Sequence, residues 1–470
     1  MNKIVERIQK EFKNTPDLKI KEIKVNLFKS IYVIFLETIC SGDKINDYIL
    51  KNLTFYNSKN NLQSNIPGPN TSIITNHDEI EFYLTNGFAI VISNTNIIAI
   101  EVKGELTRSI SNPTREPSLL GPEDAFNENY QTNLGLIKRR IKSHNLKSEE
   151  IFLGRKTLTK ISINYIDDIA EENLVDEIKA RLEYIDIDGI MSAGNLINYI
   201  ESENNSIFPT VLRTERPDRA SHALLEGKVI LLMDTTPFAL ILPTFLADFI
   251  NPINDNYVKS KNVAFLKILR ATCFILSMLI PGIFIATLNY NQETIPSSLL
   301  INISTQRAGV PFPSIVELLI LLLICDMLRE SDIRFPSSFG SAISILGALI
   351  IGEAAVNAGI VSSIMIIITS LTFIASLIFT ELEISNALRY YRYMFLFFGA
   401  FLGLYGIFIG IILFLINIMS IKSLNKPYFA PIMPFNKDYF FETILKKKDK
   451  NNTKRSSLIT KKNTIKGRFS

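Results

Sequence analysis

The chain divides into two parts that differ in their pattern of hydrophobic and polar positions. Over residues 1–230, short apolar runs rich in β-branched residues alternate with amphipathic, charged stretches, which is typical of an α/β domain. Over residues 263–420, long apolar runs follow one another with few charges, which is typical of membrane-spanning helices. The pattern therefore predicts an α/β domain followed by an all-α, multipass membrane domain.

The α/β part is expected to contain two small lobes. The run IYVIFLETIC at 31–40 indicates a buried strand, and a segment with helical spacing follows it. A second strand–helix unit begins with KISINYI at 160–166. Between the units, residues 87–102 hold two apolar runs separated by Asn-Thr-Asn, which predicts a β-hairpin. The likeness of the two units is too weak to establish a duplication.

Five apolar segments of the second part are candidates for transmembrane helices. A crossing of about 30 Å of hydrocarbon needs roughly 20 apolar residues, and most of the five approach or exceed that length. A weaker sixth segment, 229–250, overlaps the stretch 231–262, which we interpret as an interfacial or re-entrant connector. The five segments are 263–287, 314–328, 339–359, 360–380 and 394–419.

The positions of basic residues predict the orientation of these segments. The linkers 328–334 and 387–393 carry two arginines each, and such linkers prefer the cytoplasmic side. The tail 421–470 is expected to be disordered and to lie near anionic lipid, because its last 25 residues hold ten basic residues and one acidic residue. Five crossings cannot place both ends on one side. Either one segment does not span the membrane or a sixth one does.

Small residues recur at helical spacing in two of the apolar segments. In lipid, close approach of backbones through small residues is a main way in which helices associate. These residues are therefore expected to form packing faces within the chain or contacts between subunits. They are Gly340, Ser344, Ala348 and Gly352 in one segment and Gly399, Gly403, Gly406 and Gly410 in the other.

A few ionisable side chains lie inside the apolar part, where they are costly and usually face a partner or a watery path. Glu317 and Glu353 are candidates for an ion pathway; the alternative is a buried pair with Arg270 that holds the helices together. Asp326 lies on the opposite helical face from Glu317 and is expected at the inner interface beside Arg329.

A short basic run, Lys138, Arg139, Arg140 and Lys142, stands out in the α/β part. It is interpreted either as a solvated helix end or as a basic patch that faces lipid headgroups or an acidic partner. The sequence favours neither alternative over the other.

Composition excludes several classes of protein. With 50 basic and 46 acidic residues the net charge is only +4, too balanced for a dedicated nucleic-acid binder. Three widely spaced cysteines and three scattered histidines favour neither a disulfide framework nor a metal centre. The N-terminus lacks the apolar core of a cleavable signal peptide, and no nucleotide-binding or metalloprotease motif occurs. We therefore expect neither an enzyme nor a cofactor.

Several long motifs occur in the order found in one family. They are REPSLLGPEDAF, LIKRRIK, TERPDRASHALLEGKVILLMDTTPF, VPFPSIVELL, LRESDIRFP, SILGALIIGEAAVNAGIVS, LGLYGI and SLNKPYFAPIMP. Over nearly its whole length the chain resembles the A subunit of the GerA-type spore germinant receptors. It departs from the family pattern at Asp326, where Glu is usual, at Thr235, where Gly is common, and at Ser331–Asp332, where a small pair is usual.

The resemblance implies a multipass protein of the spore inner membrane with its N-terminal domain on the core side. It implies two partners: a transporter-like B subunit that binds the nutrient and a C subunit that is a lipoprotein. It also implies a homo-oligomer, a pentamer in the expected case, that forms a nutrient-gated channel for monovalent cations. A ring of symmetry-related Glu side chains would concentrate such cations.

Other functions are kept as alternatives. An auxiliary germination channel of the SpoVAF type would share this architecture without a nutrient of its own. A standalone secondary transporter would show two matching halves with broken helices, and no such repeat is visible. A structural scaffold for the receptor cluster is a further alternative. The sequence does not identify the nutrient, since recognition in the family is assigned mainly to the B subunit.

Overall fold

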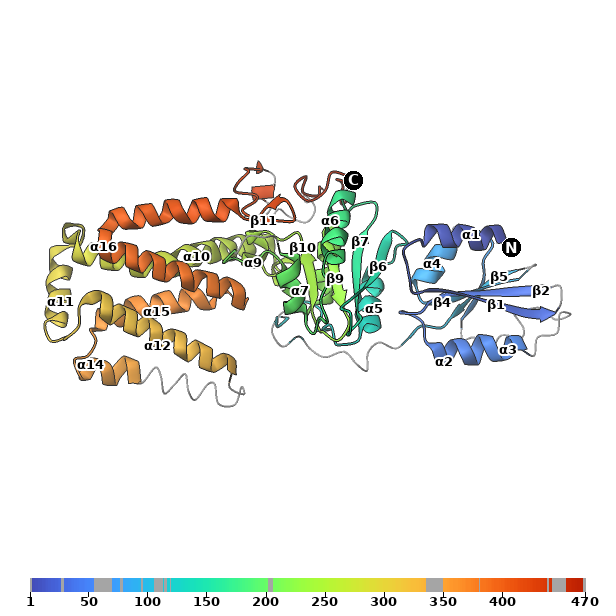
Figure 1. The fold of residues 1–470 in the computed structure, drawn as a ribbon, viewed down its shortest axis with the longest axis horizontal. Helices are drawn as coiled ribbons and strands as arrows, with labels where there is room; N and C mark the ends of the chain where they lie inside the picture. The colour runs from blue at the N-terminus through green and yellow to red at the C-terminus, as the bar shows by residue number, and fades with distance from the viewer. Residues whose placement is uncertain are drawn as a thin grey trace.

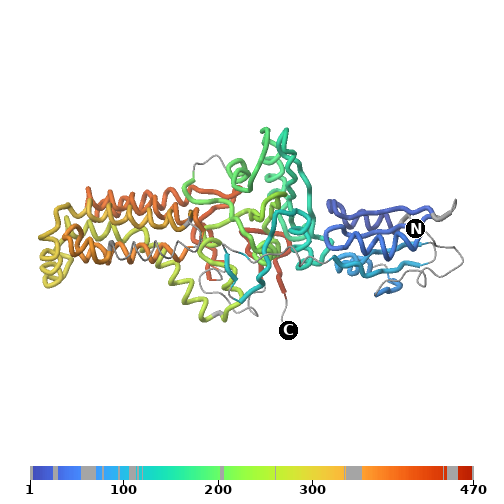
Figure 2. The backbone as a smooth tube through the Cα atoms, turned by 90° about the horizontal axis from the view of Figure 1, so that it is seen from below, coloured from blue at the N-terminus to red at the C-terminus, as the bar shows by residue number. Residues whose placement is uncertain are grey.

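The computed structural model describes residues 2–26, 29–54, 70–76, 79–93, 96–104, 113, 116–118, 120–201, 206–334, 350–379, 381–437, 439–441 and 454–467. The molecule is elongated, with an N-terminal lobe, a second lobe and a helix bundle following one another along its long axis (Figures 1 and 2). The C-terminal segment returns from the bundle to the second lobe.

The first lobe is a five-stranded antiparallel sheet with helices packed against it. The order of strands is β1-β2-β4-β5-β3, and the buried core consists largely of Ile and Val side chains from β2, β4 and β5. The hairpin predicted at 87–102 is confirmed, because β4 pairs with β5 in antiparallel register. The strands are β1 (Leu18–Asn26), β2 (Lys29–Leu36), β3 (Thr71–Ile73), β4 (Phe88–Ile92) and β5 (Ile97–Glu101), and the helices are α1 (Asn2–Glu11), α2 (Gly42–Ile45), η1 (Asn46–Leu50), α3 (Lys51–Thr54) and α4 (Glu79–Thr85).

The second lobe is built in the same way, with the order β6-β7-β9-β10-β8. Its central strands β7 and β9 are almost entirely buried, because α8 covers one face and α6 and α7 cover the other. The strands are β6 (Leu146–Leu153), β7 (Thr159–Ile166), β8 (Leu212–Thr214), β9 (Val229–Met233) and β10 (Ala239–Leu242), and the helices are α5 (Tyr130–Arg140), α6 (Glu172–Glu183), α7 (Ala193–Ile200) and α8 (Pro217–Leu225).

The two lobes share one topology. In each lobe, a helix is followed by a β-hairpin, then by helical segments and an edge strand. One more helix then leads to a second β-hairpin. In the sheet, this second hairpin lies between the first hairpin and the edge strand. Every pairing in both sheets is antiparallel. The prediction of two small α/β lobes is therefore confirmed, and the shared strand order supplies the repeat that the sequence did not establish.

The predicted connector at 231–262 is wrong over its first half. The weak apolar segment 229–250 forms β9, β10 and α9 (Leu246–Ile250), all parts of the second lobe. Central strands of a sheet that is covered on both faces are apolar throughout, so they resemble a short membrane segment in sequence. The lobe ends with η4 (Ile253–Tyr257), which leads into the first long helix of the bundle.

Every secondary-structure element that the structure describes in the bundle is helical, and turns join these helices. Two of its helices are long and apolar enough to cross a membrane, over Lys261–Asn289 and Leu382–Ser420, and five separate spans are not confirmed. Its elements are α10 (Ser260–Asn289), η5 (Gln292–Thr294), α11 (Ser297–Arg307), α12 (Ser314–Arg334), η6 (Ile350–Ala354), α14 (Ala355–Asn357), α15 (Ser363–Leu377) and α16 (Leu382–Ser420).

The element α16 is a helical hairpin. At Gly403 the backbone leaves the helical region, with φ 61° and ψ −145°, and the chain turns back on itself (Figure 1). The Tyr391 hydroxyl of the first arm donates a hydrogen bond of 2.7 Å to the Asn417 Oδ1 of the second. The apolar segment predicted at 394–419 is therefore not one span, because it contains this turn.

The C-terminal segment packs on the second lobe wherever the structure describes it. Lys426 forms an ion pair of 2.7 Å with Glu171, and Lys462 one of 2.9 Å with Glu172. The short strands β11 (Lys422–Ser423) and β12 (Lys426–Pro427) form a tight hairpin at its start. The expectation of a disordered tail is thus wrong for 421–437, 439–441 and 454–467, because its basic residues find carboxylates on the lobe.

Candidate functional site

A single apolar core joins the second lobe to the helix bundle. The ring of Phe208, from the loop before β8, stacks on Tyr391 of α16 with 5.5 Å between ring centroids. Phe274 of α10 and Tyr428 of the C-terminal segment lie 6.4 Å and 6.2 Å from the same ring. Because protein interiors are close-packed and stiff, a displacement of the lobe is transmitted to α10 and α16 through these rings.

Arg219 of α8 is the centre of an ion-pair network at this junction. Its guanidinium pairs with Glu116 and, at 3.2 Å, with Glu381, the residue that precedes α16. It also donates a 3.0 Å hydrogen bond to the carbonyl of Asp248 in α9. One side chain of the lobe is thus tied both to the loop that follows the first lobe and to the start of a bundle helix.

A second arginine, Arg216, holds the start of α8 against η4. It is 1% exposed and forms hydrogen bonds of 3.0 Å and 2.7 Å to the two carboxylate oxygens of Asp218. It also donates a hydrogen bond of 2.6 Å to the Asn254 side-chain oxygen, and the Tyr257 hydroxyl donates one of 2.7 Å to the Asp218 carboxylate. Burial alone would raise the pKa of Asp218, but the hydrogen bonds from Arg216 and Tyr257 hold that pKa below its ordinary value.

Two further pairs connect the lobe with the two long elements of the bundle. Arg213 of β8 lies 2.5 Å from Glu383 in the first turn of α16. Arg270 of α10 forms hydrogen bonds of 2.7 Å and 2.8 Å to Asp255 in η4. The expected pair of Arg270 with a bundle glutamate is therefore wrong, because the packing of η4 on α10 brings Asp255 to this arginine.

The carboxylate of Glu381 is perturbed by this environment. Burial raises the pKa of Glu381 to about 7, although the nearby positive charge of Arg219 opposes that rise. A carboxylate that titrates near neutrality therefore lies where the lobe meets the bundle. Its two close neighbours are Arg219 and Glu116, and the latter disfavours its ionised form.

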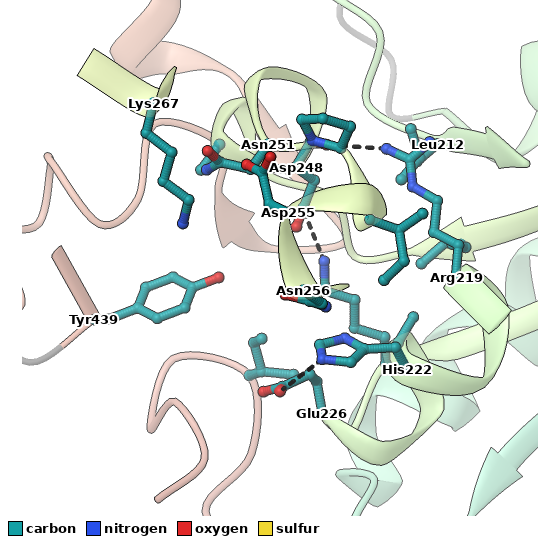
Figure 3. A pocket seen from close by; sticks show the side chains of 17 residues that line it. Leu212, Arg219, His222, Glu226, Asp248, Asn251, Asp255, Asn256, Lys267 and Tyr439 are labelled. Carbon is teal, nitrogen blue, oxygen red and sulfur yellow. Dashed lines mark hydrogen bonds and ion pairs between the residues drawn. The ribbon is translucent and has the colours of Figure 1, made fainter. Parts of the chain in front are cut away.

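A cavity of about 330 Å³ opens beside the network (Figure 3). Its wall is formed by α8, α9 and η4 of the lobe, by Lys267 of α10 and by Tyr439 of the C-terminal segment. His222 faces Glu226 across one turn of α8, with 4.0 Å between the nitrogen and the carboxylate oxygen. Three parts of the molecule thus share one polar cavity, so its shape depends on how they are placed relative to one another.

Within the bundle, Glu317 is fully buried at the contact of two helices. Its Oε1 accepts hydrogen bonds of 2.5 Å from the Ser362 backbone N–H and 2.6 Å from the Ser362 hydroxyl. Its Oε2 lies 3.7 Å from the Arg307 Nε, without a hydrogen bond among the described residues. Since Ser362 precedes α15, the carboxylate holds α12 to the start of that helix.

Asp326 lies in a second charged cluster of the bundle. The Tyr393 hydroxyl donates a 2.7 Å hydrogen bond to it, and Arg389 and Arg392 approach it at 3.3 Å and 3.7 Å. Arg329, the neighbour expected from the sequence, lies within electrostatic range of all three charged groups. The expected association of Asp326 with Arg329 is therefore incomplete: the closer partners come from α16.

The second candidate for the ion pathway lies in different surroundings. Glu353, in η6, is exposed in the single chain, and so is Gly352. Glu317 is fully buried, so one chain does not present the two carboxylates to a common space. The predicted packing residues Gly340, Ser344 and Ala348 lie outside the described residues.

The glycines of α16 make contacts within the chain. A Cβ on Gly399 would lie 2.3 Å from the carbonyl oxygen of Gly282 in α10. A Cβ on Gly406 would lie 2.1 Å from the Phe398 carbonyl, and one on Gly410 would lie 2.9 Å from the Phe395 ring. These residues bring α10 and the two arms of α16 together, so within the chain they are packing positions, while Gly403 is the turn.

Comparison with known proteins decides the family. The family model described as "Bacillus/Clostridium GerA spore germination protein" matches residues 6–458. The chain is 35% identical over 445 residues to spore germination protein KA of Bacillus subtilis (strain 168), covering 92% of this chain and 82% of that protein. It is 32% identical over 476 residues to spore germination protein GerLA of Bacillus cereus, covering 98% and 96%. The chain belongs to the GerA family of spore germination proteins.

A solved structure is also similar: the N-terminal domain of the A subunit of the Bacillus megaterium spore germinant receptor GerK3. The match has 30% sequence identity and a TM-score of 0.41, and covers 52% of this chain and 94% of that domain.

The motifs that carry the GerA resemblance supply the residues of the junction. Glu116 comes from REPSLLGPEDAF, and Arg216, Asp218 and Arg219 come from TERPDRASHALLEGK. Their contacts were not expected, because their partners are distant in sequence and only the fold brings them together. The signal was the run of alternating charges around Arg216, which is unusual at the start of a buried helix.

The basic run of LIKRRIK is mostly a structural element of this GerA-family protein. Lys138 is buried and paired with Asp17 of the first lobe, and Arg140 pairs with Asp124 at 2.6 Å. Arg139 and Lys142 line a second cavity of about 340 Å³ between the lobes. For Lys138 and Arg140, neither the solvated helix end nor the surface patch is correct, because both side chains are bound to carboxylates.

Proposed function

We propose that the chain is the A subunit of a nutrient germinant receptor in the inner membrane of the spore. Its membership of the GerA family and the names of its relatives support a role in spore germination. The observation that carries the finer proposal is the Arg219 network, which ties the α/β lobes to the bundle helix α16. A receptor needs such a connection to pass a binding event to the membrane.

The bundle crosses the membrane six times in this proposal. Five of the crossings are α10, α12, α15 and the two arms of α16. The sixth is assigned from the sequence alone to the apolar segment 339–359, of which residues 339–349 lie outside the described residues. The turn at Gly403 divides one predicted segment into two crossings in this scheme, which favours the second of the two alternatives left by the charge distribution, a sixth crossing. An even number of crossings agrees with the packing of the C-terminal segment on the second lobe, which requires both on one side of the membrane. The arginines at the lobe-facing ends of α12 and α16 favour the spore core for this side.

The proposed activity is conduction of monovalent cations by a homo-oligomer, a pentamer in the simplest arrangement, without an enzymatic step or a cofactor. Glu353 is exposed in the single chain, so neighbouring copies can bring their Glu353 side chains around a common axis. Glu317 acts differently in this scheme, as the tie between α12 and α15 whose release would let the bundle rearrange.

The proposed partners are a B subunit that binds the nutrient and a C subunit that is a lipoprotein. The lobes receive the signal, and the shared aromatic core around Phe208 passes it to α10 and α16. The alternative, an auxiliary channel without its own nutrient, would use the same bundle and the same junction.

Cation release from spores lacking the gene, tested nutrient by nutrient, distinguishes the two. Loss of the response to one set of nutrients identifies a receptor subunit, whereas equal slowing for every nutrient identifies the auxiliary channel.

Conduction is tested in liposomes that contain the purified chain. Glu353→Gln is expected to lower cation selectivity. Glu293→Gln is the control, because Glu293 is exposed in η5. Equal selectivity of the unchanged protein and both variants would refute an ion pathway through Glu353.

A further inference from the structure

We propose that Arg329, Arg389 and Arg392 form a site for the phosphate of an anionic phospholipid at the lobe-facing surface of the membrane. The inference rests on the proposed crossing of the membrane by α12 and α16. It assigns a ligand to a cluster that the proposed conduction does not use.

The three arginines share a single carboxylate. Arg389 Nε lies 3.3 Å and Arg392 Nη1 3.7 Å from the same Asp326 oxygen, Oδ1. Arg329 adds a third guanidinium within electrostatic range of this group. The other carboxylate oxygen is already bound by the Tyr393 hydroxyl at 2.7 Å. Among the residues that the structure describes, three positive charges therefore share one carboxylate, an excess of two positive charges.

Arg392 makes this imbalance costly. Only 2% of the side chain is exposed, and its Nε donates a 3.1 Å hydrogen bond to the Ser277 carbonyl of α10. Its Nη1 makes no hydrogen bond among the described residues. A buried guanidinium with an unused donor is unfavourable, and an anion bound at the neighbouring, partly exposed Arg329 and Arg389 would offset its charge.

Among the described residues, few carboxylates could supply the missing anion. Of the two further carboxylates on α12, Glu330 is paired with Arg334 at 2.7 Å, and Asp332 is exposed. The stretch 335–349, which follows α12 and lies outside the described residues, contains no ionisable side chain in its sequence. The counter-charge is therefore expected from outside the chain.

The position of the cluster fits a lipid headgroup. The end of α12 and the start of α16 both lie at the end of the bundle nearer the second lobe (Figure 1). Arg389 follows Leu382, the first residue of α16, by seven residues, about 10 Å along the helix, and Arg329 lies in the last two turns of α12. Arg389 and Arg329 are partly exposed, so a phosphate can reach them. Guanidinium groups bind phosphate oxygens in a two-pronged geometry.

Exposed apolar side chains on the same two helices suit the acyl chains of such a lipid. Leu323 and Met327 of α12 and Tyr390 of α16 are exposed by 46%, 67% and 56%. Tyrosine is enriched at membrane interfaces. Basic groups between helices, bordered by apolar surface, are a recurrent form of lipid-headgroup site.

The test uses the full chain in detergent micelles doped with phosphatidylglycerol or phosphatidylcholine, with bound lipid counted by native mass spectrometry. The unchanged protein is expected to retain phosphatidylglycerol in preference to phosphatidylcholine. The double variant Arg329→Gln, Arg389→Gln is expected to weaken this binding roughly tenfold or more, because it removes the two partly exposed arginines that a phosphate can reach. Arg334→Gln, five residues further along α12 and 76% exposed, is the matched control and should bind as the unchanged protein does.

Several outcomes would overturn the proposal. Equal retention of the two lipids, or equal losses in the double variant and the control, would show that no specific headgroup is bound. Full displacement by inorganic phosphate would show a site for free phosphate. If the preference for phosphatidylglycerol disappears when the chain oligomerises, a neighbouring copy of the chain supplies the anion in place of a lipid. Cation flux is measured separately: a conducting protein without lipid preference refutes only the site, and a lipid-selective protein without conduction refutes only the proposed channel.

Discussion

At the scale of single residues, the junction is held by charges that are largely out of water. The side chains of Arg219 and Glu116 are 11% and 13% exposed, and Arg216 is buried completely against Asp218. Such pairs add little net stability compared with apolar residues, but loss of one partner leaves an uncompensated buried charge. The network therefore fixes the relative position of lobe and bundle more than it stabilises either.

Arg219→Gln is expected to lower the free energy of unfolding by about 3 kcal/mol, because it leaves Glu116 and Glu381 without their cation. Thermal unfolding of the full chain in detergent measures the effect. Arg155→Gln is the matched control, since Arg155 pairs with Asp186 on the surface, where the side chains are 67% and 65% exposed. Equal melting temperatures for the two variants would contradict the role assigned to the network.

The raised pKa of Glu381 predicts a dependence on pH. Its folded-state pKa of about 7 exceeds the ordinary value of about 4.3 for glutamate, so the folded state holds the proton more tightly than the unfolded state. This contribution to stability is present near pH 4 and is lost as the pH rises through 7. Glu381→Gln should flatten the fall in melting temperature between about pH 5 and pH 8. An unchanged slope would show that Glu381 is not the titrating group.

At the scale of secondary-structure elements, alternation and helical spacing were enough to predict two α/β lobes and the β4–β5 hairpin. They were not enough for β9 and β10, since strands covered on both faces carry no alternation. The turn of α16 at Gly403 was also missed. The carbonyls of Ala400 and Phe401 before this turn accept hydrogen bonds of 3.0 Å from the hydroxyl of Tyr290, which follows α10 and is distant in sequence, so only the glycine marks the turn locally.

The candidate site shows the same limit. Glu317 was a candidate for the ion pathway, with a buried pair to Arg270 as the alternative; the structure buries its carboxylate but binds it to Ser362. The partner of Arg270 could not be predicted, since Asp255 reaches it only through the packing of η4 on α10. Periodicity fixes which face of an element is buried, but pairing between elements depends on the tertiary arrangement.

The close packing of α10 on α16 leads to a prediction at this scale. Gly399→Ala is expected to destabilise the chain by about 2 kcal/mol, because the added methyl group would lie 2.3 Å from the Gly282 carbonyl oxygen. Gly309→Ala is the control, since no atom lies within 4 Å of the added carbon. Thermal unfolding of both variants checks this. A Gly399 variant as stable as the control would mean that the two helices are not in backbone contact.

At the scale of the whole molecule, the described parts form one connected path. The paired lobes meet through the buried Lys138–Asp17 pair, the second lobe meets the bundle through Arg219 and the Phe208 rings, and the C-terminal segment returns to the lobe. The cavity beside Arg219 is lined by all three of lobe, bundle and C-terminal segment. A change in the lobes is therefore expected to be felt both at the start of α16 and at the C-terminal segment.

The same arrangement predicts the topology. Because the C-terminal segment binds Glu171 and Glu172 of the second lobe, we expect both chain ends on one side of the bilayer. Epitope tags at the N-terminus and after Ser470 should be digested by protease from the same face of sealed membrane vesicles, while a tag inserted at Gly309, in the turn after α11, should be digested only from the opposite face. Tags at the two ends that are reached from opposite faces would require an odd number of crossings. That result would mean either that the two arms of α16 do not both span the membrane or that another segment fails to cross. It would also place the C-terminal segment and the lobe on which it packs on opposite sides of the membrane.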